Sequence, residues 1–358
     1  MARWLSSRLG APLLIGASLL LTGCGQFPGA QGRDDLVLSI GQSQTVKPAA
    51  AHSELFLDYA LLADQSYADS LYEAAKARPY DVGPNTYCKG RQKPGDPCRD
   101  AEGLTDHAIQ RLRGWRRIYA EKEAGRFPCP ATRPGCSEPL PGLGVQVWMK
   151  AGRVCPEAAI VFRGTDGQAA DDWLSNLRWL LRLVPLYDQY EQVQDYTPAF
   201  VGVIEREPCF RRGRTRIVAI GHSLGGGLAQ QSAYRDGRVR YVAAIDPSFV
   251  TGVEDLDPKI VASNVPGLGI DRLYERGEIL SFPRIVVQQF DPPRTCDPMI
   301  RTVRLDTMRG NPVAQHSLAN MVTSLLAWSK ERRSRGLPAD MPLPGPGAGT
   351  CRASRVWS

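Results

Sequence analysis

The sequence has little of what a membrane-spanning, zinc-binding or nucleic-acid-binding protein requires. Its apolar run at residues 11–21 is shorter than the roughly 20 apolar residues that a membrane-spanning helix needs. No CxxC motif or close histidine pair is present, so we predict no metal site. The arginines are scattered along the chain and no nucleic-acid-binding motif occurs, so we expect no DNA or RNA partner. The absence of an internal repeat argues against a repeat architecture.

What is present is the composition of an ordinary globular protein. The chain has 358 residues, of which 43% are hydrophobic and 8% aromatic, enough to bury one large core or two modest ones. The formal net charge is +7. This modest positive excess favours attraction to anionic membrane surfaces, or it only aids solubility.

Residues 1–24 are typical of an export signal. Arg3 and Arg8 form a basic region, an apolar run follows, and the segment ends in the small-residue sequence LTGC at 21–24. This tetrapeptide resembles the lipobox of bacterial lipoproteins, in which the cysteine, here Cys24, is lipidated and anchors the protein. An ordinary secretory signal is the alternative. Because Gly25 follows and not aspartate, the resemblance implies a lipid anchor in the outer membrane of the bacterial cell envelope, facing the periplasm or the cell surface.

Nine cysteines in an exported chain indicate disulfide bonds. If Cys24 is lipidated, the even remainder of eight allows up to four disulfides. We predict two local pairs, Cys88 with Cys98 and Cys129 with Cys136, because each closes a short loop rich in proline and glycine.

Composition divides the chain beyond the export signal into three segments. Residues 25–51 are rich in small and polar residues and are predicted to form a flexible tether. Residues 52–330 are predicted to form the folded domain, with an irregular insertion rich in cysteine, proline and glycine at 79–142. Residues 331–358 form a tail rich in proline and glycine.

Within the folded domain, hydrophobic spacing predicts both helices and strands. Helical spacing covers residues 54–77 and returns at 105–124. Continuous apolar strands are typical of a parallel sheet that is buried on both faces by helices, so an α/β fold is expected. The predicted strands cover residues 145–149, 158–162, 217–220 and 241–245.

The pentapeptide GHSLG at residues 221–225 fits the pattern G-x-S-x-G, with a predicted strand before it and a predicted helix after it. Such a turn leaves no room for side chains two positions either side of Ser223, which explains Gly221 and Gly225. It also exposes the serine hydroxyl and lets the backbone N–H of Leu224 point at a developing oxyanion. We predict Ser223 as a nucleophile and Leu224 as an oxyanion donor; the alternative is a serine in a glycine-rich turn.

A serine nucleophile needs a base, and the sequence offers four histidines. His52 lies by the predicted tether and His107 lies in an early helical segment. His222 is adjacent to Ser223, so its side chain is expected to point away and to pack or form a structural hydrogen bond. His316 alone follows the serine, as the chain order serine, acid, histidine requires. We predict His316 as the base; a surface histidine at a helix start is the alternative.

The acid that orients the base has two principal candidates. Glu278 follows a short strand-like run and a glycine, whereas Asp246 directly follows the predicted strand at 241–245. Asp291 and Asp297 are weaker candidates. Each of these carboxylates could instead cap a turn or pair with an arginine, and this alternative is strongest for Asp246.

These motifs together resemble the class 3 lipases, the fungal-type triacylglycerol lipase and phospholipase group of the α/β-hydrolase fold. The matching features are FRGT at 162–165, GHSLGG at 221–226, the late His316 before an apolar helix, and an early helical segment at 59–67. The resemblance implies an α/β-hydrolase with a mostly parallel central sheet and helices on both faces; the cysteine-rich insertion departs from the family.

The resemblance also implies roles for individual residues. Ser223 and His316 match the nucleophile and base, and Thr165 matches an oxyanion donor that partners Leu224. Glu278 stands where the family has an aspartate, so glutamate departs from the pattern. The apolar stretch at 173–185 is either core packing or a lid that contacts lipid.

The sequence therefore predicts a carboxylic ester hydrolase that acts on lipid esters through an acyl-enzyme and requires no cofactor. Two alternatives remain: an envelope lipoprotein that uses the fold only for binding, and an acyltransferase that passes the acyl group to an acceptor other than water.

Overall fold

The computed structural model of the 358-residue chain describes residues 35–40, 43–68, 70–76, 104–120, 143–164, 189–281, 284, 296–306, 312–336 and 338. Several predicted features lie outside these residues. They are the export signal with Cys24, the pairs Cys88 with Cys98 and Cys129 with Cys136, Thr165, the stretch at 173–185, and Asp291.

A nine-stranded mixed sheet runs through the described part of the chain in the order β2-β1-β9-β8-β7-β6-β5-β4-β3. The five strands β5 to β9 pair in parallel, and antiparallel strands extend the sheet at both ends. The strands are β1 (Asp35–Ile40), β2 (Ser43–Pro48), β3 (Trp115–Ala120), β4 (Val145–Lys150), β5 (Glu157–Phe162), β6 (Arg216–His222), β7 (Val239–Ile245), β8 (Gly269–Glu275) and β9 (Met299–Leu305).

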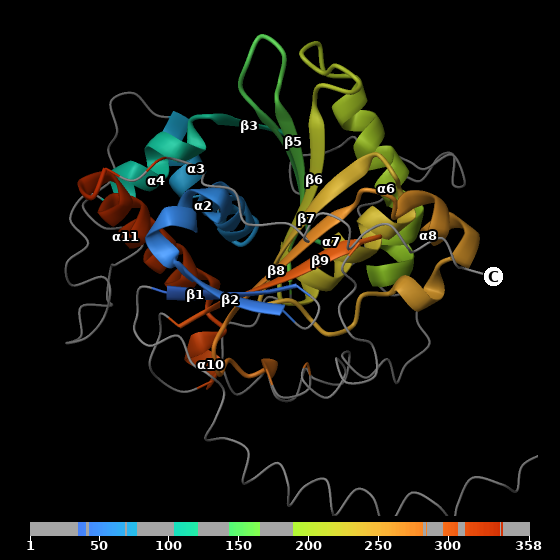
Figure 1. Cartoon of the computed structure of the whole chain (residues 1–358). Helices are drawn as coiled ribbons and strands as arrows, with labels where there is room; N and C mark the ends of the chain where they lie inside the picture. The colour runs from blue at the N-terminus through green and yellow to red at the C-terminus, as the bar shows by residue number, and fades with distance from the viewer. Residues whose placement is uncertain are drawn as a thin grey trace, which may run out of the picture.

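Helices cover both faces of this sheet (Figure 1). One layer consists of α2 (Ala49–Gln65), α3 (Ser70–Lys76), α4 (Leu104–Leu112) and α11 (Leu318–Ser334), and the other of α6 (Gln189–Glu205), α7 (Leu224–Arg235) and α8 (Pro258–Asn264). Two short elements join the larger ones, a 3₁₀ turn at Val253–Asp255 and α10 (Pro312–Gln315).

The central strands are apolar throughout because both of their faces are buried. Along β6, Val218 and Ile220 pack in the core beneath α2 and α11, whereas Ile217 and Ala219 pack in the core beneath α6 and α7. This alternation follows from the two-residue period of a strand. The four strands predicted from apolar runs are therefore confirmed as β4, β5, β6 and β7, and the α/β fold with them.

Three predictions based on local pattern were wrong in their details. The predicted tether at 25–51 includes β1, β2 and the start of α2, since this segment pairs with β9 and joins the sheet. The predicted helix at 105–124 is α4 followed by β3, because residues 115–120 pair with β4. The predicted helix at 54–77 is divided into α2 and α3.

A disulfide joins Cys155, which precedes β5, to Cys209, which follows α6. This pair was not predicted, because its cysteines are 54 residues apart in sequence. Within the described ranges, no helix is long and apolar enough to cross a membrane.

Candidate active site

Ser223 lies on the sharp turn between β6 and α7. Its backbone angles are φ 57° and ψ −124°, which a residue other than glycine rarely adopts. The turn is held from both sides: the Ser223 N–H donates to the Ile245 carbonyl at 3.0 Å, and its carbonyl accepts from Ser248 N–H at 2.9 Å. A strained serine between a central parallel strand and a helix is the turn geometry expected in the α/β-hydrolase fold, and this fold prediction is confirmed.

Two glycines make the turn possible. A Cβ atom on Gly221 would lie 2.0 Å from the Gly225 carbonyl oxygen, and one on Gly225 would lie 2.2 Å from the Phe162 carbonyl oxygen. Both distances are far below van der Waals contact. The requirement for small residues two positions either side of Ser223 is therefore a direct steric consequence of the fold.

The region beside the serine is suited to stabilising negative charge. Leu224 is the first residue of α7, where the backbone N–H has no acceptor within the helix. Gly164, at the end of β5, lies so close that a Cβ atom on it would be 3.3 Å from Ser223 Cβ. Thr165, the second predicted donor, lies outside the described residues.

Glu278 and His316 form a buried pair. His316 Nδ1 lies 2.8 Å from Glu278 Oε2, and both side chains are almost inaccessible to solvent. The carboxylate only accepts, so Nδ1 carries the proton in this bond, and Nε2 of the neutral ring is the nitrogen that can take up another. The backbone supports the pair: Ile279 N–H donates to the Pro312 carbonyl at 3.1 Å, which ties the Glu278 turn to the His316 segment.

Glu278 is held in its charged form. Burial by itself raises the pKa of this carboxyl, but the hydrogen bond from His316 and the charge of Arg284 outweigh burial and lower it below the usual value. Arg284 Nη1 lies 2.6 Å from Glu278 Oε1, and Leu280 N–H donates to Oε2 at 2.8 Å. Sequence reasoning missed Arg284, because no local pattern marks an arginine that will meet a buried carboxylate.

Asp246, the alternative acid, lies close by but in a different electrostatic state. It is fully buried, and its Oδ1 accepts a hydrogen bond from Glu275 N–H at 3.0 Å. Burial and the negative charge of Glu278 raise the pKa of Asp246 well above its ordinary value. The pKa values of the two neighbouring carboxyls are thus moved in opposite directions, and Glu278 is the carboxylate in contact with His316. Asp297 lies elsewhere and accepts from Gly267 N–H.

His222 links the elbow to the base. Its Nε2–H donates to the His316 carbonyl at 3.0 Å, and its Nδ1 accepts from the Tyr67 hydroxyl at 3.2 Å. The rings of His222 and His316 lie 4.9 Å apart, which places His316 beside the Ser223 turn. The same Tyr67 hydroxyl accepts from Gly164 N–H at 2.9 Å. His222 thus has the structural role expected for it, whereas Tyr67 carries no local signal of its own.

His222 is expected to make the protein sensitive to acid. Burial, and then the neighbouring His316, lower the pKa of His222 from 6.5 to about 3. Below pH 6.5 the unfolded chain therefore binds a proton that the folded chain does not, and stability falls as pH falls. Between pH 7 and pH 5 this single group should cost about 2 kcal/mol of unfolding free energy. In urea unfolding, the free energy of a His222→Gln variant should fall by about 2 kcal/mol less than that of wild type between pH 7 and pH 5. Equal losses in the two proteins would contradict the lowered pKa of His222.

Donor atoms of His222, Asp246 and His316 lie within 4.8 Å of one another, which raises the question of a metal. Both ring nitrogens of His222 are already in hydrogen bonds, and His316 Nδ1 is bound to Glu278. A metal ion would have to break one of these bonds. The contacts fit an acid–base arrangement better than a ligand set.

Comparisons with known proteins find a family match over about half of the chain. A family profile described as phospholipase-like, with a Tle-like phospholipase domain, matches residues 58–244, slightly more than half of the chain. The matched segment includes Ser223, whereas Glu278 and His316 follow it. No curated protein matches the sequence significantly. The class 3 lipase resemblance itself stays a prediction.

Several solved structures are distantly similar. A lipase from Rhizopus microsporus var. chinensis is 14% identical with a TM-score of 0.37, over 74% of this chain and 85% of that one. A Pyrobaculum calidifontis esterase is 11% identical with a TM-score of 0.34, over 72% and 100% of the two chains. Est1E from Butyrivibrio proteoclasticus is 10% identical with a TM-score of 0.32, over 55% and 97%. Such values carry no information about the substrate.

Proposed function

Because the chain belongs to the phospholipase-like family with a Tle-like phospholipase domain, we propose that it is a serine hydrolase that cleaves a carboxylic ester bond of a phospholipid. The observation that carries the proposal is the buried His316–Glu278 pair beside the strained Ser223 turn. The proposed nucleophile Ser223, acid Glu278 and base His316 follow one another in the chain order of an α/β-hydrolase.

In the proposed reaction, Ser223 Oγ attacks the ester carbonyl while His316 Nε2 accepts the hydroxyl proton. Glu278 stabilises the resulting imidazolium, and the Leu224 N–H, with Thr165 as the proposed second donor, stabilises the oxyanion. The C–O bond to the leaving group then breaks, and His316 returns the proton to the departing alcohol. Water, activated by the same histidine, releases the acid and restores Ser223. No cofactor takes part in these steps.

The proposal includes a place for the reaction. A lipid anchor on Cys24 would hold the enzyme at the cell envelope, where phospholipid substrate is concentrated. This location is supported only by the LTGC sequence at residues 21–24.

Labelling with a fluorophosphonate tests the nucleophile. The full chain should form a covalent adduct that peptide mass spectrometry assigns to Ser223, and heat-denatured protein should not react, because an activated serine requires the folded triad. In parallel, phosphatidylglycerol and phosphatidylcholine in detergent micelles should yield free fatty acid and lysophospholipid.

The same experiment separates the alternatives. Labelling of Ser223 with transfer of the acyl group to an added alcohol, in place of release as fatty acid, would indicate an acyltransferase. Absence of both labelling and product would leave a binding lipoprotein as the better description. A series of p-nitrophenyl esters from acetyl to palmitoyl would then show whether any ester is cleaved.

A further inference from the structure

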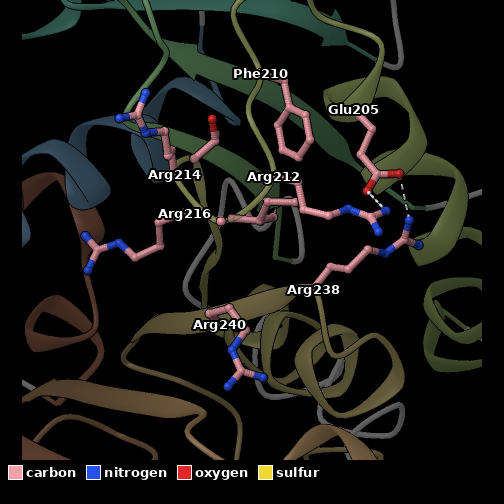
Figure 2. A pocket seen from close by; sticks show the side chains of 10 residues that line it. Glu205, Phe210, Arg212, Arg214, Arg216, Arg238 and Arg240 are labelled. Carbon is pink, nitrogen blue, oxygen red and sulfur yellow. Dashed lines mark hydrogen bonds and ion pairs between the residues drawn. The ribbon is translucent and has the colours of Figure 1, made fainter.

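A basic hollow lies at the edge of the sheet opposite the catalytic turn. It has a volume of about 470 Å³ and lies at the start of β6 and β7. Five arginines line it, together with Phe210 and a single carboxylate, that of Glu205 (Figure 2). The arginines are Arg212, Arg214, Arg216, Arg238 and Arg240.

Parallel strand pairing brings these arginines together. Arg212, Arg214 and Arg216 lead into β6, while Arg238 and Arg240 lie at the start of β7. The register pairs Ile217 with Val239, so the two arginine segments enter the sheet side by side. Positive charge that is distributed along the sequence is therefore concentrated at one edge.

The segment that bears these arginines is fixed before any ligand arrives. The disulfide between Cys155 and Cys209 anchors its beginning, and Cys155 N–H donates to the Cys209 carbonyl at 3.0 Å. The Thr215 hydroxyl donates to the Cys155 carbonyl at 2.7 Å and accepts from Arg211 N–H at 3.0 Å. A fixed segment loses little conformational entropy on binding.

The positive charge of the hollow is only partly compensated. Glu205 pairs with Arg212 at 3.5 Å and with Arg238 at 2.9 Å. Asp236 also pairs with Arg238, at 2.6 Å, and Glu157 pairs with Arg216. Arg240 donates only to the backbone carbonyls of Gly237 and Pro266. Among the described residues, no carboxylate lies within ion-pair distance of Arg214 or Arg240. Both arginines are exposed to solvent.

The side chains do not converge on one point. In Figure 2, Arg212 and Arg238 extend towards Glu205, whereas Arg214 and Arg216 point to the other side. Arg240 points away from both groups, and Phe210 lies between Arg214 and Glu205 in this view. This spread suits a ligand with more than one negative group better than a single small anion. Guanidinium groups favour phosphate because its oxygens match their paired N–H donors.

We propose that this hollow is a binding site for a ligand that carries more than one phosphate charge, separate from the catalytic site. Arg216 is the first of the seven residues of β6 and Ser223 directly follows the last, which puts the two sites about 20 Å apart at the rise of a strand. A ligand in the hollow is thus not the ester under attack. The proposal does not depend on the catalytic role of Ser223.

Titration calorimetry of the full chain with inorganic pyrophosphate tests the site. Wild-type protein should bind, and the Arg214→Gln/Arg240→Gln double variant should bind at least about tenfold more weakly, because charge-assisted hydrogen bonds are lost. Glu205→Gln should bind more tightly, since it removes the carboxylate that pairs with Arg212, while Arg238 stays paired with Asp236. A Lys330→Gln/Arg335→Gln variant at the C-terminal end of α11 changes the net charge by the same amount and should bind like wild type.

Vesicles distinguish a lipid headgroup from a free ligand. In the Ser223→Ala background, which prevents cleavage of the lipid, cosedimentation compares vesicles of phosphatidylcholine with added cardiolipin, whose headgroup carries two phosphates, with vesicles of phosphatidylcholine alone. A preference for cardiolipin that needs Arg214 and Arg240 and is competed by pyrophosphate identifies a headgroup site. Pyrophosphate binding without this preference identifies a free phosphate-bearing ligand. No pyrophosphate binding by correctly folded wild type, or equal weakening in the α11 control, would overturn the proposal.

Discussion

Replacing Ser223 with alanine is expected to lower the rate of ester hydrolysis by about 10⁴- to 10⁶-fold, the range seen when a member of a catalytic triad is removed. The reason is that the other groups of the site act through this oxygen. His316 has no hydroxyl left to deprotonate, and the Leu224 N–H has no covalent intermediate to stabilise. The measurement is kcat on a short p-nitrophenyl ester and on a phospholipid.

The matched control for this variant is Ser232→Ala. Ser232 is a buried serine on α7, and its hydroxyl donates only to the Ala229 carbonyl within the same helix. The control should keep activity within a few-fold, and both variants should unfold near the wild-type temperature. A folded Ser223→Ala protein with undiminished kcat would remove the serine mechanism from consideration.

Replacing Glu278 with glutamine is expected to lower kcat by about 10³- to 10⁴-fold, because the amide no longer fixes the His316 tautomer or stabilises the imidazolium. Asp246→Asn should retain most of the activity, since burial and Glu278 raise the pKa of Asp246 and the asparagine amide resembles a protonated carboxyl. Comparing the two variants decides between the acids that the sequence left open. Full activity in Glu278→Gln together with a large loss in Asp246→Asn would reverse the assignment.

Glu278→Gln also affects stability, because it leaves the buried Arg284 without its carboxylate. Removing one partner of a buried ion pair costs about 3–5 kcal/mol. A Glu278→Asp variant keeps a negative charge near Arg284, but its shorter side chain moves the carboxylate away from His316. It should fold better than Glu278→Gln while kcat stays reduced, which separates the effect on the base from the effect on folding.

Local pattern was enough to predict the centre of the sheet and not its ends. Strands such as β5 are apolar at nearly every position because helices cover both faces, and this composition is visible in the sequence. The edge strand β2 has no such signal: its residues are mostly exposed, and it exists as a strand through its pairing with β1. The predicted tether was wrong at these residues because strand pairing is a long-range property.

Ser223 was predictable for a similar reason. The tight turn leaves no room for a Cβ atom at Gly221 or Gly225, and because this restriction acts within five residues, the local sequence shows it. His316 was predicted from chain order alone. The choice between Glu278 and Asp246 required the structure, because burial and the contact with Arg284 set the two pKa values in opposite directions.

The sequence by itself determined the α/β architecture, the sharp turn at Ser223 and the candidate base, because these depend on residue spacing and on steric demands within a few residues. Only the tertiary structure decided which carboxylate meets His316, which cysteines pair, and that arginines from two segments gather at one edge of the sheet. Each of these depends on contacts between residues tens of positions apart, such as Glu278 with His316 and Cys155 with Cys209. Those contacts exist only once the parallel strands have paired, so no local pattern encodes them.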